Sequence, residues 1–228
     1  MWKIAFLFIS AVTCSLQAGE HIFVSGGPAL RYFERHKDKD HDKYWGNFIV
    51  SVVARQKEVS QEYGADDLLT WLIYKPAHQS RDKEEKVDFM PSIIANAAKI
   101  NATLIWFSTK DELINYINTG QDRSKIKIER FEYFGHSNKR CFMFDYSNKL
   151  DGAVPDFSAL HLDDLKKIKP SSFDPRAHCQ SWGCHSGEEF SRAWFKQVKV
   201  PMLGAIGKTD YSKGGVPHLS TQQGRWAQ

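Results

Sequence analysis

One stretch of the sequence, residues 177–198, combines a thiol with the pattern of a strand, a tight turn and a helix. The turn reads Gly-Cys-His-Ser-Gly, and its Cys184 follows a short run of apolar and small residues. Phe190, Trp194 and Val198 then recur at helical spacing and form one apolar face. We therefore expect Cys184 where a strand ends and a helix begins. Unpaired N–H groups and the helix dipole at such a place favour the thiolate, which is the nucleophilic form of cysteine.

A histidine occupies a matching position earlier in the chain. Residues 126–134 are strand-like and are followed by Gly135 and His136. Open parallel sheets carry their ligand sites at the carboxyl ends of the strands, so neighbouring strands would bring this imidazole to the sulfur of Cys184. Thiol catalysis needs such a base beside the nucleophile. Taken singly, each residue also has an ordinary interpretation, as a polar histidine and a small core cysteine.

Other residues near these two strand ends would serve the reaction or hold the substrate. Backbone N–H groups around Gly135, Ser137, Gly183 and the nucleophile itself would stabilise the oxyanion. Asp210, just after the last expected strand, could bind a basic side chain of the substrate, and Asp145 is a second choice. Both acids equally fit ordinary positions in surface turns.

Strand-like and helix-like segments alternate along the chain. We expect strands at residues 21–25, 70–74, 103–108, 126–134, 177–182 and 202–206, with an accessory strand at 141–146, and helices at 48–63, 86–100, 110–118, 161–168 and 190–198. This alternation predicts a single α/β domain over residues 19–228: a three-layer sandwich of a mainly parallel sheet with helices on both faces. The turn at residues 26–28 follows the first strand but lacks the signature of a phosphate-binding loop.

This arrangement of motifs resembles the caspase-like cysteine peptidases, which include the legumains, gingipains, clostripains and separases. The resemblance rests on a strand that ends in Gly135-His136, a gap of about fifty residues, and a strand that ends in Cys184 within a Gly/Ser-rich turn. Ser137 stands where that family usually has a glycine. The resemblance implies a sheet sandwiched by helices, His136 as acid and base, Cys184 as nucleophile, and no metal or other cofactor in the chemistry.

Residues 1–18 have the pattern of a signal peptide. Lys3 supplies one positive charge, an apolar run follows, and small residues lead to Ala18. Cleavage there would leave a mature chain that begins at Gly19 and is secreted or periplasmic, and lipid modification of Cys14 is the alternative. The apolar run is too short to span a membrane as a helix, and no later stretch is long enough, so we expect a protein that does not span the membrane.

Export also changes how the remaining cysteines are interpreted. Cys141 and Cys179 could form a disulfide, since exported proteins occupy compartments that allow it, and at least one of the three thiols would stay free or pair between chains. The spacing of Cys179 and Cys184 is looser than a metal-binding Cys-x-x-Cys hook, and no second hook follows, so this pair predicts no metal site. The 31 basic and 27 acidic residues are spread along the chain, which excludes a dedicated nucleic-acid surface.

Together these observations predict an exported cysteine endopeptidase that acts on a peptide or protein substrate. An esterase or amidase could use the same pair of residues. A protein without catalysis could instead use the same cleft to hold a peptide or a surface partner. No pattern in the sequence indicates an oligomeric state.

Overall fold

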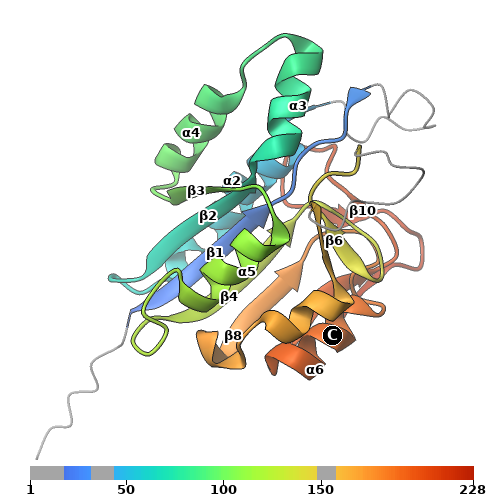
Figure 1. Ribbon diagram of the computed structural model, residues 1–228. Coiled ribbons are helices and arrows are strands. Elements are labelled where there is room, and N and C mark those ends of the chain that lie inside the picture. Colours follow the sequence, from blue (N-terminus) through green and yellow to red (C-terminus); the bar gives the residue numbers. More distant parts are fainter. Residues whose placement is uncertain (1–17, 32–43, 148–157) are drawn as a thin grey trace, which may run out of the picture.

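Seven strands form the central sheet of the computed structural model, which describes residues 18–31, 44–147 and 158–228 (Figure 1). The strands are β1 (Gly19–Ser25), β2 (Leu68–Tyr74), β3 (Thr103–Phe107), β4 (Lys127–Phe134), β8 (Phe173–Ser181), β9 (Met202–Ile206) and β12 (Arg225–Ala227). Their order in the sheet is β12-β9-β8-β4-β1-β2-β3. All neighbours are parallel except β12, which runs antiparallel to β9.

Helices cover both faces of this sheet, as the alternation of segments predicts. On one face lie α2 (Asn47–Val59) and α4 (Met90–Lys99), and on the other lie α5 (Lys110–Thr119), α6 (Phe190–Val198) and the 3-10 helix η3 (Leu162–Lys167). Each layer buries its own apolar cluster against the sheet. Phe190, Trp194 and Val198 of α6 are fully buried, which confirms the apolar face expected there. The three-layer α/β architecture is confirmed.

The strand order reverses between β1 and β4. From β1 the sheet continues to β2 and β3 on one side, and from β4 it continues to β8 and β9 on the other. Open α/β sheets bind their ligands in the crevice outside the carboxyl ends of the strands at such a reversal. The turns that follow the two strands are joined there, because the Gly26 N–H donates to the Phe134 carbonyl oxygen at 2.9 Å. The expected site therefore lies beside this crevice.

Some elements differ from the sequence expectation. The helix α3 (Lys75–Glu85) follows β2 directly and is not among the elements expected from the sequence; Pro76 lies in its first turn. Proline fits the first turn of a helix, where its missing N–H costs no hydrogen bond. The expected helix at residues 161–168 is the 3-10 helix η3. The accessory strand is shorter, β6 (Cys141–Met143), and lies between β5 (His136–Ser137) and β7 (Ala159–His161).

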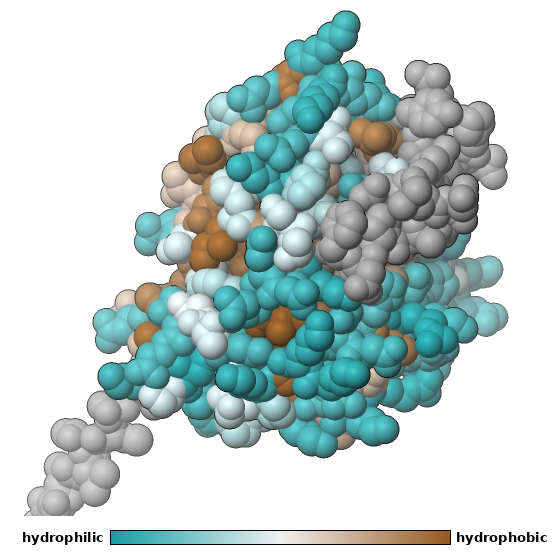
Figure 2. Space-filling view, in the orientation of Figure 1, coloured by the Kyte–Doolittle hydropathy of each residue, from teal (hydrophilic) through white to brown (hydrophobic). Residues whose placement is uncertain are grey.

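The surface carries hydrophobic side chains in separate places rather than in one broad patch. The face in Figure 2 is mostly hydrophilic. The large hydrophobic residues that are exposed in the described chain lie on different elements: Tyr44, Val87, Ile94 and Phe195. Within the same residues, no helix combines the length and apolar character that crossing a membrane requires. The expected signal peptide, apart from Ala18, and Cys14 lie outside the described residues.

Candidate functional site

The turns that carry the expected histidine and cysteine touch each other. β4 and β8 are adjacent and parallel, as the dyad requires. A Cβ atom placed on Gly183 would lie 2.2 Å from the Ser137 Oγ and 2.9 Å from the Gly135 carbonyl oxygen. The Ser137 hydroxyl also donates to the Cys184 carbonyl oxygen at 2.6 Å. The residues next to His136 and Cys184 are thus in direct contact, and a glycine at 183 allows it.

The position of Cys184 relative to the following helix differs from the expectation. Helix α6 begins only at Phe190, and residues 183–189 form turns, so the thiol does not lie at a helix N-terminus. His185 has a left-handed backbone with φ of 59°, and its N–H donates to the Gly207 carbonyl oxygen at 2.7 Å. This bond ties the turn to the end of β9 instead of letting it continue directly into the helix.

The half-buried sulfur of Cys184 contacts Thr209 in β10 (Thr209–Asp210). It lies 3.4 Å from the Thr209 backbone nitrogen, 3.5 Å from Oγ1 and 3.8 Å from the carbonyl oxygen. The Thr209 N–H donates to the sulfur, the thiol donates to the carbonyl oxygen, and either atom can be the donor between the sulfur and the hydroxyl. Sequence reasoning singled out only the neighbouring residue Asp210. Thr209 could have been recognised because it follows β9, which lies next to β8 and ends at the same edge of the sheet.

Aromatic rings hold the half-buried imidazole of His136. The Phe48 ring of α2 meets it edge-on at a centroid distance of 5.1 Å, and the Tyr146 ring stacks on it at 4.8 Å. Phe48 also packs edge-on against Tyr211, with centroids 4.8 Å apart. Tyr211 follows β10, so the contacts of His136 lead to the strand that touches the sulfur. Sequence reasoning missed all three aromatic residues: Phe48 and Tyr211 come from segments distant in the chain, and Tyr146 ends the expected accessory strand, where nothing marked it as a partner of His136.

Two of the expected oxyanion donors have partners within the fold. The Gly135 N–H donates to the Tyr211 hydroxyl oxygen at 3.2 Å, and the Gly183 N–H donates to the Ser181 Oγ at 3.3 Å. An oxyanion could bind at either glycine only if these bonds broke. The conformation described here therefore leaves neither N–H group open to a substrate.

Two other N–H groups fit the role better. The Asn138 N–H donates to the Cys141 carbonyl oxygen at 3.1 Å, and the next pair in the register is Ser137 with Phe142. Antiparallel pairs alternate between hydrogen-bonded and non-hydrogen-bonded, so the Ser137 N–H points away from β6. The N–H of Cys184 makes no hydrogen bond within the described residues. Ser137 and Cys184 thus provide the donors that suit an oxyanion.

Of the two acids, Asp210 is the one near the sulfur of Cys184, because it adjoins Thr209, which contacts that sulfur. It directly follows Thr209, its carboxylate accepts the Ser212 N–H at 2.7 Å, and the His218 Nε2 lies 4.0 Å away. Burial alone would raise the pKa of Asp210, but hydrogen bonds from Ser212 and the charge of His218 lower it overall. With 32% of its side chain exposed, this ionised carboxylate can be reached by a substrate.

Asp145 lies on the histidine side of the site instead. It directly precedes Tyr146, which stacks on His136, and it is buried. Its carboxylate accepts the Ser147 N–H at 2.9 Å, as in an ordinary turn. Burial raises the pKa of Tyr74, and the charge of Asp145 adds to that rise, which places this acid near the end of β2. The two acids therefore lie on different sides of the dyad.

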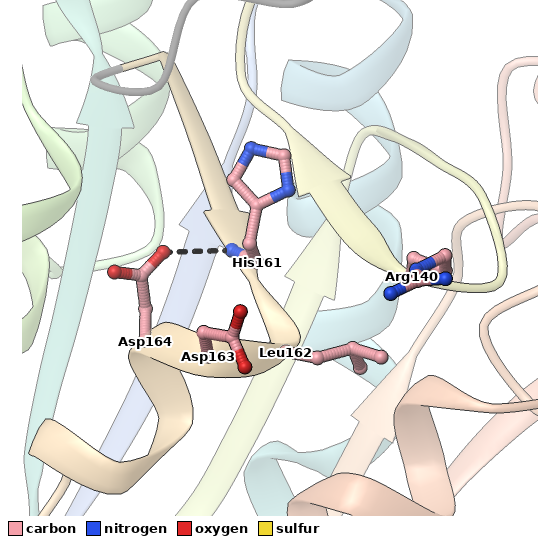
Figure 3. A pocket seen from close by; sticks show the side chains of 5 residues that line it. All are labelled: Arg140, His161, Leu162, Asp163 and Asp164. Atoms are coloured by element: carbon pink, nitrogen blue, oxygen red, sulfur yellow. Dashed lines mark hydrogen bonds between the residues drawn. The ribbon is translucent and has the colours of Figure 1, made fainter.

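A shallow pocket of about 230 Å³ lies next to the site but contains none of the expected residues. Figure 3 shows its five lining residues, Arg140, His161, Leu162, Asp163 and Asp164. Arg140 belongs to the turn between β5 and β6, which connects the pocket with the His136 hairpin. Asp164 already accepts hydrogen bonds from the His161 N–H and the Lys110 ammonium group, each at 3.0 Å. These contacts give the pocket's carboxylate a structural role.

The disulfide between Cys141 and Cys179 does not form. Both are buried free thiols. Cys179 lies within the central sheet, where it pairs with Phe131 on one side and Met202 on the other, whereas Cys141 belongs to the small sheet. Burial raises the pKa of Cys141 to about 11 and raises that of Cys179 well above its usual range. Cys184 is thus the accessible thiol among the described residues.

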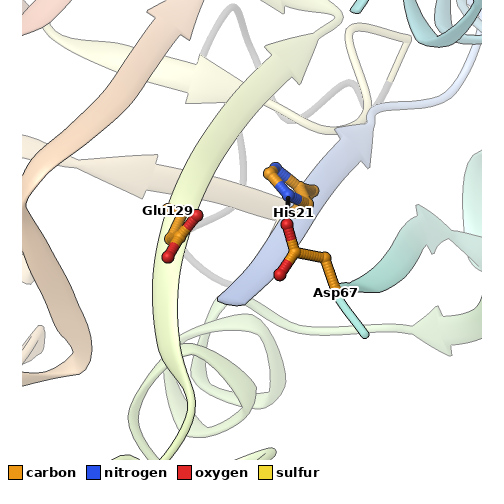
Figure 4. Close-up of side chains that lie close together, drawn as sticks. All are labelled: His21, Asp67 and Glu129. Atoms are coloured by element: carbon orange, nitrogen blue, oxygen red, sulfur yellow. Dashed lines mark hydrogen bonds and ion pairs between the residues drawn. The ribbon is translucent and has the colours of Figure 1, made fainter. Parts of the chain in front are cut away.

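The carboxyl edge of the sheet therefore combines a half-buried thiol, an imidazole held by aromatic rings, two candidate N–H donors and an ionised acid. Acyl transfer through a thiol uses groups of these types: a nucleophile, a base and oxyanion donors. The one His/Asp/Glu group with metal-ligand spacing in the described chain, His21 with Asp67 and Glu129, lies at the opposite, amino edge (Figure 4). No protein-family model, curated protein or solved structure matches this chain.

Proposed function

We propose that this protein is an exported cysteine hydrolase, most simply an endopeptidase of the caspase-like type. The observation that carries the proposal is the contact between the two strand-end turns, in which Gly183 packs on Gly135 and Ser137. This contact brings the backbones beside His136 and Cys184 to one place on adjacent parallel strands.

In the proposed reaction, the thiolate of Cys184 attacks the carbonyl carbon of a peptide bond. The carbonyl oxygen becomes an oxyanion, which the N–H groups of Cys184 and Ser137 stabilise. When the tetrahedral intermediate collapses, the carbon–nitrogen bond breaks and His136 donates a proton to the leaving amine. Water, deprotonated by His136, then hydrolyses the thioester and regenerates the thiol. Asp210 would hold a basic side chain of the substrate.

The proposal includes export. Its basis is the signal-peptide pattern of residues 1–18, which would direct the mature chain to a secreted or periplasmic location. Mass spectrometry of protein from the native host should find a mature terminus at Gly19. A chain that keeps Met1 would refute the export part, and an acylated Cys14 would favour a lipoprotein.

A thiol-reactive peptide probe tests the enzyme proposal. It should label Cys184 in the folded protein and leave the buried thiols of Cys141 and Cys179 unlabelled, so that these serve as internal controls. A Cys184→Ser variant should lose both the labelling and the hydrolysis of peptide substrates. Parallel assays with ester and simple amide substrates then distinguish a peptidase from an esterase or amidase. If Cys184 labels no faster than a cysteine in a denatured control peptide, the enzyme proposal fails.

One observation favours a second candidate, a peptide-binding protein without catalysis. The Gly135 N–H beside the histidine is bonded to the Tyr211 hydroxyl and not left open. This bond closes one of the expected oxyanion donors, which a binding protein would not need. Two results together would support this candidate. The parent protein would show no hydrolytic activity, and the Cys184→Ser variant would bind peptides as tightly as the parent.

A further inference from the structure

The amino edge of the sheet, opposite the candidate site, holds a second cluster of chemically capable groups. Its members are His21 on β1, Glu129 on β4 and Asp67 just before β2, and their side chains converge in Figure 4. The His21 Nε2 lies 2.9 Å from the Asp67 Oδ2. The other oxygen of Asp67 accepts the Gly19 backbone N–H at 2.8 Å. The cluster therefore surrounds the first residue of β1.

Glu129 covers the same glycine from the other side. A Cβ atom on Gly19 would lie 2.3 Å from the Glu129 Cδ and 2.7 Å from its Oε1, so this carboxylate lies directly over the glycine and would have to move for a larger residue. The register between β1 and β4 pairs Glu20 with Ile128 and His21 with Arg130, which leaves Glu129 as an extra, bulged residue. Bulges redirect a side chain, and here the bulge places a carboxylate over the start of β1.

The cluster carries surplus negative charge. Burial lowers the pKa of His21, which keeps this imidazole neutral, so the charge of Asp67 is stabilised by hydrogen bonds from His21, Gly19 and Gly64 and not by a positive charge. Burial raises the pKa of Glu129, and the charges of Asp67 and Asp174 raise it further, while Arg176 opposes the rise. The other charged groups that face His21 are paired with each other, namely Arg130 and Glu62. A cation between Asp67 and Glu129 would relieve this repulsion.

We propose that cleavage after Ala18 supplies that cation, and that the new α-ammonium group of Gly19 is bound between the carboxylates of Asp67 and Glu129. The inference rests on the export part of the proposed function and is independent of the Cys184 chemistry. A signal-cleaving peptidase would hydrolyse the bond between Ala18 and Gly19: the hydroxyl of water goes to the Ala18 carbonyl carbon, a proton goes to the Gly19 nitrogen, and the amine takes up a further proton from solvent.

The geometry favours the amino terminus over a metal ion. The oxygens of Asp67 already accept N–H groups from Gly19 and Gly64, as well as contacting His21. A metal would have to displace these partners, whereas the Gly19 nitrogen is in place before cleavage. The second ring nitrogen of His21 is buried without a hydrogen-bond partner, and metal-binding histidines almost always have one there. Binding of the ammonium group requires neither the displacement of these partners nor a hydrogen bond to the second ring nitrogen of His21.

This binding makes a prediction about protonation. An unperturbed α-amino group has a pKa of about 7.7–8.0, and pairing with two carboxylates should raise it by about one unit. Because the folded-state pKa is then above the unfolded value, the stabilisation is complete below about pH 8 and is lost as the pH rises through the folded-state pKa. One unit corresponds to an about tenfold change in the folding equilibrium.

The experiment uses the full chain expressed with its own leader in an exporting host. Mass spectrometry first identifies the mature terminus. The pH dependence of α-amine acylation is then measured for the folded protein, for the protein in urea, and for a Glu129→Gln variant. At pH 7.5 the folded parent should react about tenfold more slowly than the unfolded chain, and the variant should recover most of that difference. Glu58→Gln, at an exposed glutamate of α2, is the matched control and should behave like the parent.

The outcomes separate this inference from the proposed function. A mature terminus other than Gly19 overturns both this inference and the cleavage site, and leaves the Cys184 labelling test unaffected. A Gly19 terminus whose α-amine titrates alike in the folded and unfolded parent overturns the binding site while export stands. If Zn²⁺ or Mn²⁺ raises the melting temperature of the parent but not of Glu129→Gln, and the α-amine titrates normally, the cluster is a metal site instead. The comparison within the parent remains decisive even if Glu129→Gln does not fold.

Discussion

The contact between the two site turns can be tested with a single added methyl group. In Gly183→Ala the new Cβ would lie 2.2 Å from the Ser137 Oγ and 2.9 Å from the Gly135 carbonyl oxygen, whereas ordinary contacts begin at 3.4 Å. The serine oxygen must therefore retreat by about 1.2 Å, the difference between these two distances. Its bond to the Cys184 carbonyl oxygen would break. The Gly135 oxygen is backbone, so the histidine turn must move as well.

The magnitude follows from these two effects. Overpacking of a well-packed site costs about 1–3 kcal/mol, and a lost hydrogen bond costs about 0.5–1.5 kcal/mol. Gly183→Ala should therefore lower the free energy of unfolding by about 2–4 kcal/mol. The displacement also separates the His136 and Cys184 turns, and a misplacement of about 1 Å can reduce the rate of a positioned reaction about a hundredfold. We expect the peptide-probe labelling of Cys184 to slow accordingly.

Urea unfolding and probe labelling measure both quantities. Gly215→Ala is the matched control, because a Cβ there meets nothing within 4 Å, and its effect should stay within about 0.5 kcal/mol. Ser137→Gly removes the side chain that the new methyl group strikes. In the double variant with Gly183→Ala the costs should fall short of additivity by about 0.5–3 kcal/mol. Additive costs, or a Gly183→Ala variant as stable as the control, would refute the contact.

Three further predictions concern titration, specificity and the base. Burial lowers the pKa of His78 to about 4, so between about pH 4 and pH 6.5 this histidine is protonated only in the unfolded state. Stability should therefore fall by about 3 kcal/mol as the pH drops through this window, and urea unfolding of His78→Gln should lack this loss. If Asp210 grips a basic substrate residue, Asp210→Asn should reduce that preference about ten- to a hundredfold in a peptide panel while labelling of Cys184 survives. His136→Ala should slow hydrolysis by about 10²–10⁴-fold, but Thr209→Val, which keeps the N–H beside the sulfur, should have a smaller effect. Equal rates in His136→Ala and the parent would exclude the dyad.

The sequence predicts the layers and the edge where the site lies for a physical reason. Buried parallel strands appear as short apolar runs, and a helix against a sheet shows its apolar face at regular spacing, as Phe190, Trp194 and Val198 do. Both signals are local. Because the carboxyl ends of parallel strands share one edge, the endings of two such runs also locate His136 and Cys184.

The remaining features depend on contacts that no local pattern reveals. Phe48 reaches His136 from a segment far away in the chain, and Tyr146 reaches it because the chain folds back between β5 and β6, so neither contact can be predicted from spacing. Pro76 is compatible both with the end of a strand and with the first turn of a helix, and the structure uses it for both. Cys184 is separated from the start of α6 by a turn that is bonded to the end of β9.

The turn between Cys184 and α6 changes how the thiol must be activated. A helix N-terminus stabilises a nearby anion by about 0.3–1 kcal/mol, whereas hydrogen bonds to a charged group contribute about 1.5–3 kcal/mol. The Thr209 N–H donates to the sulfur at 3.4 Å, so β10 supplies a donor where the helix end is missing. Thr209 and Asp210 together make up β10. In the proposed enzyme, one two-residue strand thus stabilises the nucleophile with its first residue and binds the substrate with its second, which couples thiol reactivity to substrate recognition.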